Sequence, residues 1–147
     1  MKEEKFLVGS NAFFKNIKDF KSKDKDYLIL TDTPIGFKFQ KEICLRGVDY
    51  FYHKNDGPKN LIERTLQTND PILAGKFLIP EVAEAIGISI EDLKLLEDLI
   101  YRVDDKHKYQ IIIYESIIQN NSFELTDEQI MKSYNCYLYY RKNWNKT

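Results

Sequence analysis

Hydrophobic and polar positions follow different patterns in the two halves of the chain. In the first half, short runs rich in β-branched and aromatic residues alternate with charged segments, which predicts strands at 6–8, 26–31 and 48–52 and a further strand around 37–43. In the second half, apolar residues recur every three or four positions, which predicts helices. We therefore expect an α/β (α+β) protein, with a small sheet and helices in residues 1–70 and a helical C-terminal region in residues 71–147.

The segment after the first predicted strand reads as a helix. Gly9 allows a sharp turn at the strand end, and Ser10 would open the helix. The helix is supported by four apolar residues on one face, namely Phe13, Phe14, Ile17 and Phe20. The free N–H groups of such a helix start, together with its positive dipole end, favour phosphate as a ligand.

Turn and capping residues mark the expected helices of the second half. A helix at 58–67 follows the turn Asn55-Asp56-Gly57, and another starts at Pro80 and ends at Gly87. Ser89 would cap a helix that carries Leu93, Leu96, Ile100 and Val103. Residues 106–119 read as a helix, although 111–114 could instead form a strand. Thr126 and Gln129 form a capping-box pattern for a last helix that ends near Arg141.

Composition excludes several classes of protein. The chain has 147 residues, 43% hydrophobic and 31% charged, with a formal net charge of −1, so nothing in its overall charge attracts it to nucleic acid or to a membrane. No segment is long and apolar enough to span a bilayer, and residues 1–4 lack a signal-peptide core. Cys44 and Cys136 are too few for a disulfide framework or a zinc site. We expect a cytoplasmic protein.

Three aspartates of the first half form a candidate metal site. Asp24 and Asp26 are two positions apart at the start of a predicted strand, so they would face the same side. Asp49 lies in the neighbouring predicted strand, where a charged residue is unusual and costly to bury without a partner. Mg²⁺ or Mn²⁺ prefers oxygen ligands of this kind, and Mg²⁺ completes its shell with water and substrate phosphates.

The order Gly9-Ser10, Asp24-x-Asp26, Asp49 resembles the signature of the DNA polymerase β-like nucleotidyltransferases, in particular their small single-domain members. The resemblance covers about a third of the chain. It implies a small mixed sheet of nucleotidyltransferase type and ATP or another nucleoside triphosphate as substrate. It also implies that Gly9 and Ser10 hold the triphosphate, that Asp24 and Asp26 bind the metal ions, and that Asp49 helps activate the acceptor hydroxyl.

The chain also departs from the family pattern. Ser10 precedes Asp24 by 14 positions, toward the long end of the family's range. The residue between the first two aspartates is usually apolar in the family and here is Lys25, which on a strand would face away from the carboxylates. Asp49 follows Asp26 by 23 positions. Its assignment is the weakest of the three, and Glu42 on the preceding predicted strand is the next candidate.

The expected function is transfer of a nucleoside monophosphate from a nucleoside triphosphate to an acceptor, with release of pyrophosphate. The acceptor could be a protein side chain, an RNA end or a small metabolite. The alternative is a non-catalytic protein that uses the same fold to bind a nucleotide or a partner. Taken singly, a Gly-Ser pair also marks ordinary turns and an Asp-x-Asp segment among lysines also occurs in solvated loops.

The second half offers a minor alternative. Ala83, Gly87 and Leu93 have the spacing of a helix-turn-helix DNA-binding unit. The helix after Ser89 carries four carboxylates against the single Lys94, so it would repel DNA phosphates.

The remaining candidate residues favour a structural role. The aromatic cluster comprises Tyr134, Tyr137, Tyr139, Tyr140 and Trp144. It could stack on bases, but helical spacing places Tyr134, Tyr137 and Leu138 on one stripe and favours packing in a core or between subunits of a homo-oligomer. His53 and His107 lack companion ligands and read as surface or hydrogen-bonding residues.

Overall fold

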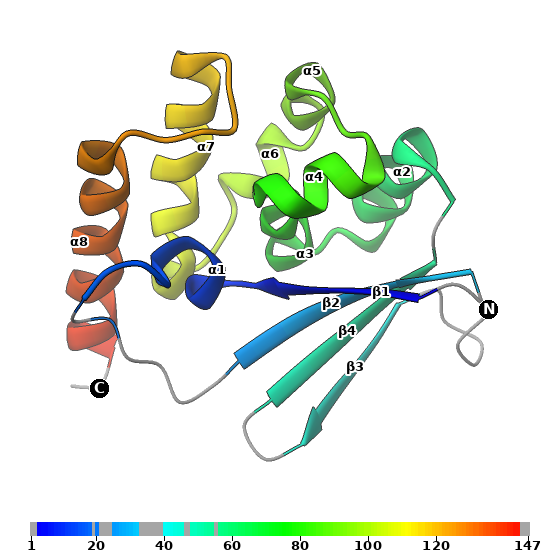
Figure 1. The fold of residues 1–147 in the computed structure, drawn as a ribbon, viewed down its shortest axis with the longest axis horizontal. Helices are drawn as coiled ribbons and strands as arrows, with labels where there is room; N and C mark the ends of the chain where they lie inside the picture. The colour runs from blue at the N-terminus through cyan, green and yellow to red at the C-terminus, as the bar shows by residue number, and fades with distance from the viewer. Residues whose placement is uncertain are drawn as a thin grey trace. The chain divides into compact units, whose positions relative to one another are not determined.

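The computed structural model describes residues 3–18, 20, 25–32, 40–45, 48–54 and 56–144, and for 40–45, 48–52, 54 and 143–144 it describes the backbone alone. The chain combines a β-sheet with helices, as the sequence pattern predicts (Figure 1). It divides into two compact units, Met1–Leu61 and Ile62–Thr147. The division falls inside the helix Pro58–Thr68.

The first unit contains a mixed sheet. Its strands are β1 (Glu3–Val8), β2 (Lys25–Thr31), β3 (Gln40–Leu45) and β4 (Val48–Lys54), in the spatial order β1-β2-β4-β3 (Figure 1). The β1 strand runs antiparallel to β2, β2 runs parallel to β4, and β4 runs antiparallel to β3. The parallel pair β2 and β4 therefore lies at the centre of the sheet.

The second half of β2 is buried, and it contains the apolar run Leu28-Ile29-Leu30. Leu28, Ile29, Leu30 and Thr31 are all at most 3% exposed. Because successive side chains of a strand point to opposite faces, burial of consecutive residues means that both faces of β2 are covered at this end. Its other end is different, since Lys25 is exposed and Asp26 is partly exposed.

The helix predicted for residues 10–20 is shorter than expected. The α1 helix covers only Ser10–Phe14. Beyond it, the amides of Ile17 and Phe20 donate to carbonyls three residues earlier, over 3.0 and 3.1 Å, which marks successive tight turns rather than an α-helix. The rings of Phe14 and Phe20 still meet edge to face, with centroids 5.8 Å apart. The apolar spacing thus reflects a shared contact and not one continuous helix.

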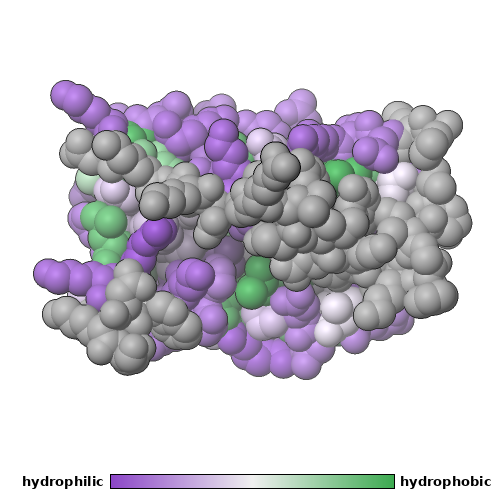
Figure 2. All heavy atoms as spheres, turned by 90° about the horizontal axis from the view of Figure 1, so that it is seen from below, coloured by the Kyte–Doolittle hydropathy of each residue, from purple (hydrophilic) through white to green (hydrophobic). Residues whose placement is uncertain are grey.

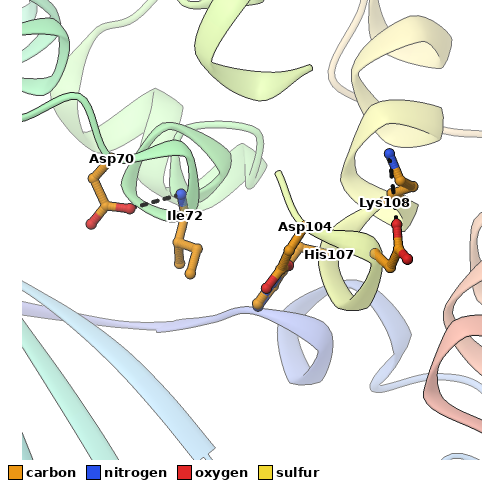
Figure 3. Close-up of polar contacts among 6 residues, drawn as sticks. Asp70, Ile72, Asp104, His107 and Lys108 are labelled. Atoms are coloured by element: carbon orange, nitrogen blue, oxygen red, sulfur yellow. Dashed lines mark hydrogen bonds and ion pairs between the residues drawn. The ribbon is translucent and has the colours of Figure 1, made fainter. Parts of the chain in front are cut away.

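Prolines open the next three helices. They are α2 (Pro58–Thr68), α3 (Pro71–Lys76) and α4 (Pro80–Ile86). Proline suits the first helical position because the amide it lacks would have no partner there. The side chain of Asp70 caps α3 by accepting a hydrogen bond from the Ile72 amide over 3.0 Å (Figure 3). The sequence pattern predicted α2 and α4 and missed the short α3.

The helix predicted after Ser89 is interrupted. It consists of α5 (Ile90–Lys94) and α6 (Glu97–Ile100). Between them, the amides of Leu95 and Leu96 donate to carbonyls three residues back, which tightens the chain and changes its direction. Ser89 caps α5 as predicted, because its hydroxyl accepts from the Asp92 amide and the Asp92 carboxylate accepts from the Ser89 amide.

The last part of the chain forms a helical hairpin. A 3₁₀ turn at Asp105–His107 leads into α7 (Tyr109–Asn120), so residues 111–114 are helical and not a strand. The α8 helix (Asp127–Trp144) follows and lies beside α7 (Figure 1). The predicted capping box at its start is confirmed. The Gln129 amide donates to the Thr126 hydroxyl over 3.1 Å, and the Thr126 amide donates to the Gln129 side chain over 3.0 Å.

The second unit has its own apolar core. Its fully buried residues include Leu73, Phe77, Leu78, Val82, Leu93, Leu96, Leu99, Ile100, Ile113 and Ile117. The α3 helix packs closely on Gln110 of α7, because a Cβ atom on Gly75 would overlap the Gln110 side-chain amide. None of the described helices is both long and apolar enough to cross a membrane. On the face seen in Figure 2, hydrophilic residues predominate among those coloured.

Candidate phosphate and metal site

The candidate site begins at the turn between β1 and α1. Gly9 has φ +75° and ψ −158°, a backbone conformation that is almost restricted to glycine. Its carbonyl accepts hydrogen bonds from the amides of Ala12 at 3.0 Å and Phe13 at 3.4 Å, so the α1 turn closes directly on Gly9. Ser10 is the first residue of that helix and is partly exposed.

Asp26 lies directly against this glycine. A Cβ atom on Gly9 would be 3.1 Å from the Asp26 Oδ2 atom. The contact follows from strand pairing, because Val8 and Asp26 are partners in the antiparallel register of β1 and β2. The residue after Val8 therefore turns beside the carboxylate, and the missing side chain of Gly9 leaves the space that the carboxylate borders.

Asp49 comes next to Asp26 along the sheet. In the parallel pair β2 and β4, the Cα atoms of Asp26 and Asp49 are register partners. Two of the three predicted carboxylate positions are thus adjacent in the backbone ladder. The structure describes Asp49 through its backbone only, and Asp24 lies outside the described residues.

The described side chains cover only part of this site. Among them, no group of three His, Cys, Asp or Glu residues is placed to hold a metal ion. Asp26 is the single member of the predicted set whose side chain is described, so the set itself stays a prediction. Lys25 is exposed, which agrees with its expected direction away from the carboxylates.

The helix-turn-helix candidate has the turn but an acidic surface. Gly87 is left-handed, with φ +88°, and its amide donates to the Ala83 carbonyl as α4 ends. In α5, Lys94 is held by Glu91 in an ion pair of 3.0 Å. The one cation of this helix is therefore partly neutralised by its own neighbour, which disfavours contact with DNA phosphates.

The two histidines occupy different environments. His53 is fully buried, which contradicts the first of its two expected roles, a surface residue, and leaves the hydrogen-bonding role as a prediction. His107 follows the expected hydrogen-bonding role, since its Nδ1 atom lies 2.6 Å from the Asp104 carboxylate (Figure 3). A second contact of the same turn, between Lys108 and Asp105 at 3.9 Å, is drawn beside it.

The aromatic residues of α8 divide between core and surface. Tyr134 and Tyr137 are 7% and 6% exposed, and the ring of Tyr109 meets Tyr137 edge to face at 5.5 Å. Their predicted packing role is thus confirmed. Leu138 and Tyr139, by contrast, are 43% and 63% exposed. Leu138 therefore does not share the buried stripe on which its spacing placed it.

Shifted tyrosine pKa values in the second unit reflect packing. Burial raises the pKa of Tyr101 to about 12, assisted by its 2.8 Å hydrogen bond to the Glu115 carboxylate. Burial also raises the pKa of Tyr114 to about 12, assisted by the charge of Glu97. Both phenols stay protonated at neutral pH, so they act there as hydrogen-bond donors and not as bases.

Comparison with family models, with curated proteins and with solved structures finds no match to this chain.

Proposed function

We propose that the first unit is a metal-dependent nucleotidyltransferase that moves a nucleoside monophosphate from a nucleoside triphosphate to an acceptor. The observation that carries this proposal is the placement of Gly9 against the Asp26 carboxylate, with Asp49 as the next position across the sheet. A phosphate-binding turn and a carboxylate pair must be adjacent if metal and triphosphate are to be bound together. These three positions lie in the turn after β1, on β2 and on β4, at residues 9, 26 and 49 of the sequence.

The sheet supports the nucleotidyltransferase-type fold. The resemblance implies a mixed sheet that carries the glycine turn after its first strand and carboxylates on two neighbouring strands. The β1-β2-β4-β3 sheet has this arrangement for Gly9, Asp26 and Asp49. We therefore interpret the sheet as the catalytic scaffold and the helical unit as an addition to it.

The proposed roles follow from the chemistry of each group. Gly9 would let the backbone approach the β and γ phosphates closely, and Ser10 would offer them its amide and hydroxyl as donors. Asp49 would accept the proton of the acceptor hydroxyl. The acceptor oxygen then bonds to the α phosphorus while the bond to the pyrophosphate oxygen breaks, so pyrophosphate leaves.

Asp24 and Asp26 would hold Mg²⁺ or Mn²⁺, with Asp49 completing the set. A Cβ atom on Gly9 would lie 3.1 Å from the Asp26 Oδ2 atom, so a side chain at this position would crowd the carboxylate. A bound ion supplies charge stabilisation for the phosphate oxygens. The acceptor remains one of three classes, namely a protein side chain, an RNA end or a small metabolite.

Thermal melts with and without ligands test the proposal. A divalent ion and a nucleoside triphosphate added together should raise the melting temperature more than either added alone, because each completes the other's coordination. Binding at a hundredfold excess over Kd stabilises a protein by about 2.7 kcal/mol.

Asp26→Asn should abolish the joint effect. Asp32→Asn, an exposed change beyond the far end of β2, should retain it. Equal joint shifts in the wild type and Asp26→Asn would refute the metal assignment.

A further inference from the structure

The α8 helix exposes a row of residues on the side away from its buried tyrosines. The row consists of Glu128, Met131, Asn135, Tyr139 and Lys142, all of them exposed, and we name it the α8 stripe. Met131 is 44% and Tyr139 is 63% exposed. The buried face of the same helix carries Ser133, Tyr134 and Tyr137. The α8 stripe therefore places two large apolar or aromatic side chains in solvent.

The spacing of the α8 stripe is symmetric about its middle residue. Its members follow one another at intervals of three, four, four and three positions, centred on Asn135. Intervals of three and four keep side chains on one face of a helix. The stripe extends about 21 Å along the helix at 1.5 Å per residue. Reversal of the helix direction exchanges Glu128 with Lys142 and Met131 with Tyr139.

This symmetry matches a twofold axis. In a homodimer with a twofold axis, the same surface of each copy contacts the other, so residue i of one copy meets residue j of the second and j meets i. With the axis beside Asn135 and the two helices antiparallel, Glu128 faces Lys142 of the second copy. Met131 likewise faces Tyr139. A parallel arrangement would instead set each charge against an identical one.

The charges of the α8 stripe are available for such a contact. Among the residues that the structure describes, Glu128 and Lys142 form no ion pair within the chain. The antiparallel arrangement gives each of them an opposite charge, twice per dimer. It also sets the positive end of one helix dipole beside the negative end of the other. Lys132, which falls opposite Leu138, can cover that leucine with its aliphatic stem.

From these observations we propose that the α8 stripe is the docking surface for a second copy of this chain, with the two α8 helices antiparallel. The proposal concerns the helical unit alone and does not rest on the proposed nucleotidyl transfer. The occupant is a second copy because the stripe is complementary to itself in both charge and apolar positions.

Molar mass in solution gives the first test. Light scattering after gel filtration should show a dimer for the wild type and a monomer for Met131→Glu and Tyr139→Glu, since each places a carboxylate in the apolar part of the contact. Leu95→Glu is the matched control. Leu95 is 60% exposed but lies outside α8, so this variant should stay dimeric.

Charge exchange gives a sharper test of direction. Glu128→Lys and Lys142→Glu should each weaken the dimer, and the double variant Glu128→Lys/Lys142→Glu should restore it, because the antiparallel pair is re-formed with the charges exchanged. Far-ultraviolet circular dichroism checks that α8 stays helical in each variant.

Crosslinking reports the position of the axis. With both native cysteines replaced by serine, Asn135→Cys should form a disulfide-linked dimer under mild oxidation, because the two Cα atoms must approach within about 7 Å for such a bond. Glu84→Cys, an exposed site on α4, should not.

Three results would overturn the proposal. One is a wild-type monomer at about 100 μM, a concentration that would populate a dimer with a Kd near 1 μM; the α8 stripe would then serve a different partner or none. Another is a dimer that Met131→Glu and Tyr139→Glu leave intact, which would place the interface elsewhere. The third is a double charge variant that dimerises no better than either single variant, which would exclude the antiparallel pairing.

Discussion

The φ angle of +75° at Gly9 and the 3.1 Å approach of the Asp26 carboxylate to a hypothetical Cβ are two separate constraints on one residue. The first excludes side chains through backbone strain. The second excludes them because they would occupy the space beside a proposed metal ligand. A glycine kept for the turn alone would need only the first constraint, and the second is what the proposed metal site adds.

Replacement of Gly9 separates these constraints. Gly9→Ala should lower the free energy of unfolding by about 1–3 kcal/mol through backbone strain, and it should also remove the joint thermal stabilisation by divalent ion and nucleoside triphosphate. Gly57→Ala is the matched control, since Gly57 has φ +93° and a Cβ atom added to it would meet no described atom within 4 Å. It should be strained but should retain the joint stabilisation. A Gly9→Ala protein that keeps the wild-type ligand shift would contradict the proposed role.

Some residue-level features were predictable from sequence and others were not. The positions of Gly9 and Ser10 at a strand-to-helix turn follow from local pattern. The contact between Gly9 and Asp26 does not, because it depends on the register that pairs Val8 with Asp26. Burial of His53 likewise depends on the tertiary packing around β4, and nothing adjacent in the sequence signals that burial.

At the scale of secondary-structure elements, helix caps were the most predictable features. The Ser89 and Thr126 caps are formed by residues three positions apart, so their signal is local. Continuity of a helix was less predictable, since the apolar spacing at 89–103 persists across the break between α5 and α6. The spacing of the α8 stripe can be read from the sequence. Only the structure shows that Met131 and Tyr139 are exposed, and this exposure is what identifies the stripe as a candidate contact surface.

The start of α8 is a quantitative test of capping. Thr126→Ala removes one capping hydrogen bond and should cost about 1 kcal/mol of stability. Gln129→Ala should cost more, because the Gln129 amide group also exchanges two hydrogen bonds with Asn120 at the end of α7, at 2.7 and 3.0 Å. Thr126→Ser should be nearly neutral. Urea unfolding measures all three, and a Gln129→Ala cost no larger than that of Thr126→Ala would show that the link to α7 contributes nothing.

At the scale of the whole molecule, the mixed α and β composition was readable from the change in hydrophobic period between the two halves. The sequence does not mark the residue at which the two compact units divide. That residue lies within α2, where the apolar spacing continues without a break. The sequence pattern places Asp49 on a strand that neighbours the strand of Asp26, but the parallel direction and the register of β2 and β4 needed the structure. That pairing makes Asp26 and Asp49 neighbours and gives the proposed function its support.

The central claim is that these carboxylates support nucleotidyl transfer, and label transfer tests it most directly. The protein would be incubated with each α-labelled nucleoside triphosphate, Mg²⁺ or Mn²⁺, and pools of protein, RNA and small metabolites. We predict that label moves to one acceptor pool and that pyrophosphate is released. Asp49→Ala should lose transfer but keep most triphosphate binding, whereas Asp24→Ala should lose both. A wild-type protein that binds triphosphate with the metal ion but transfers label to no pool would contradict the claim and favour a non-catalytic nucleotide-binding protein.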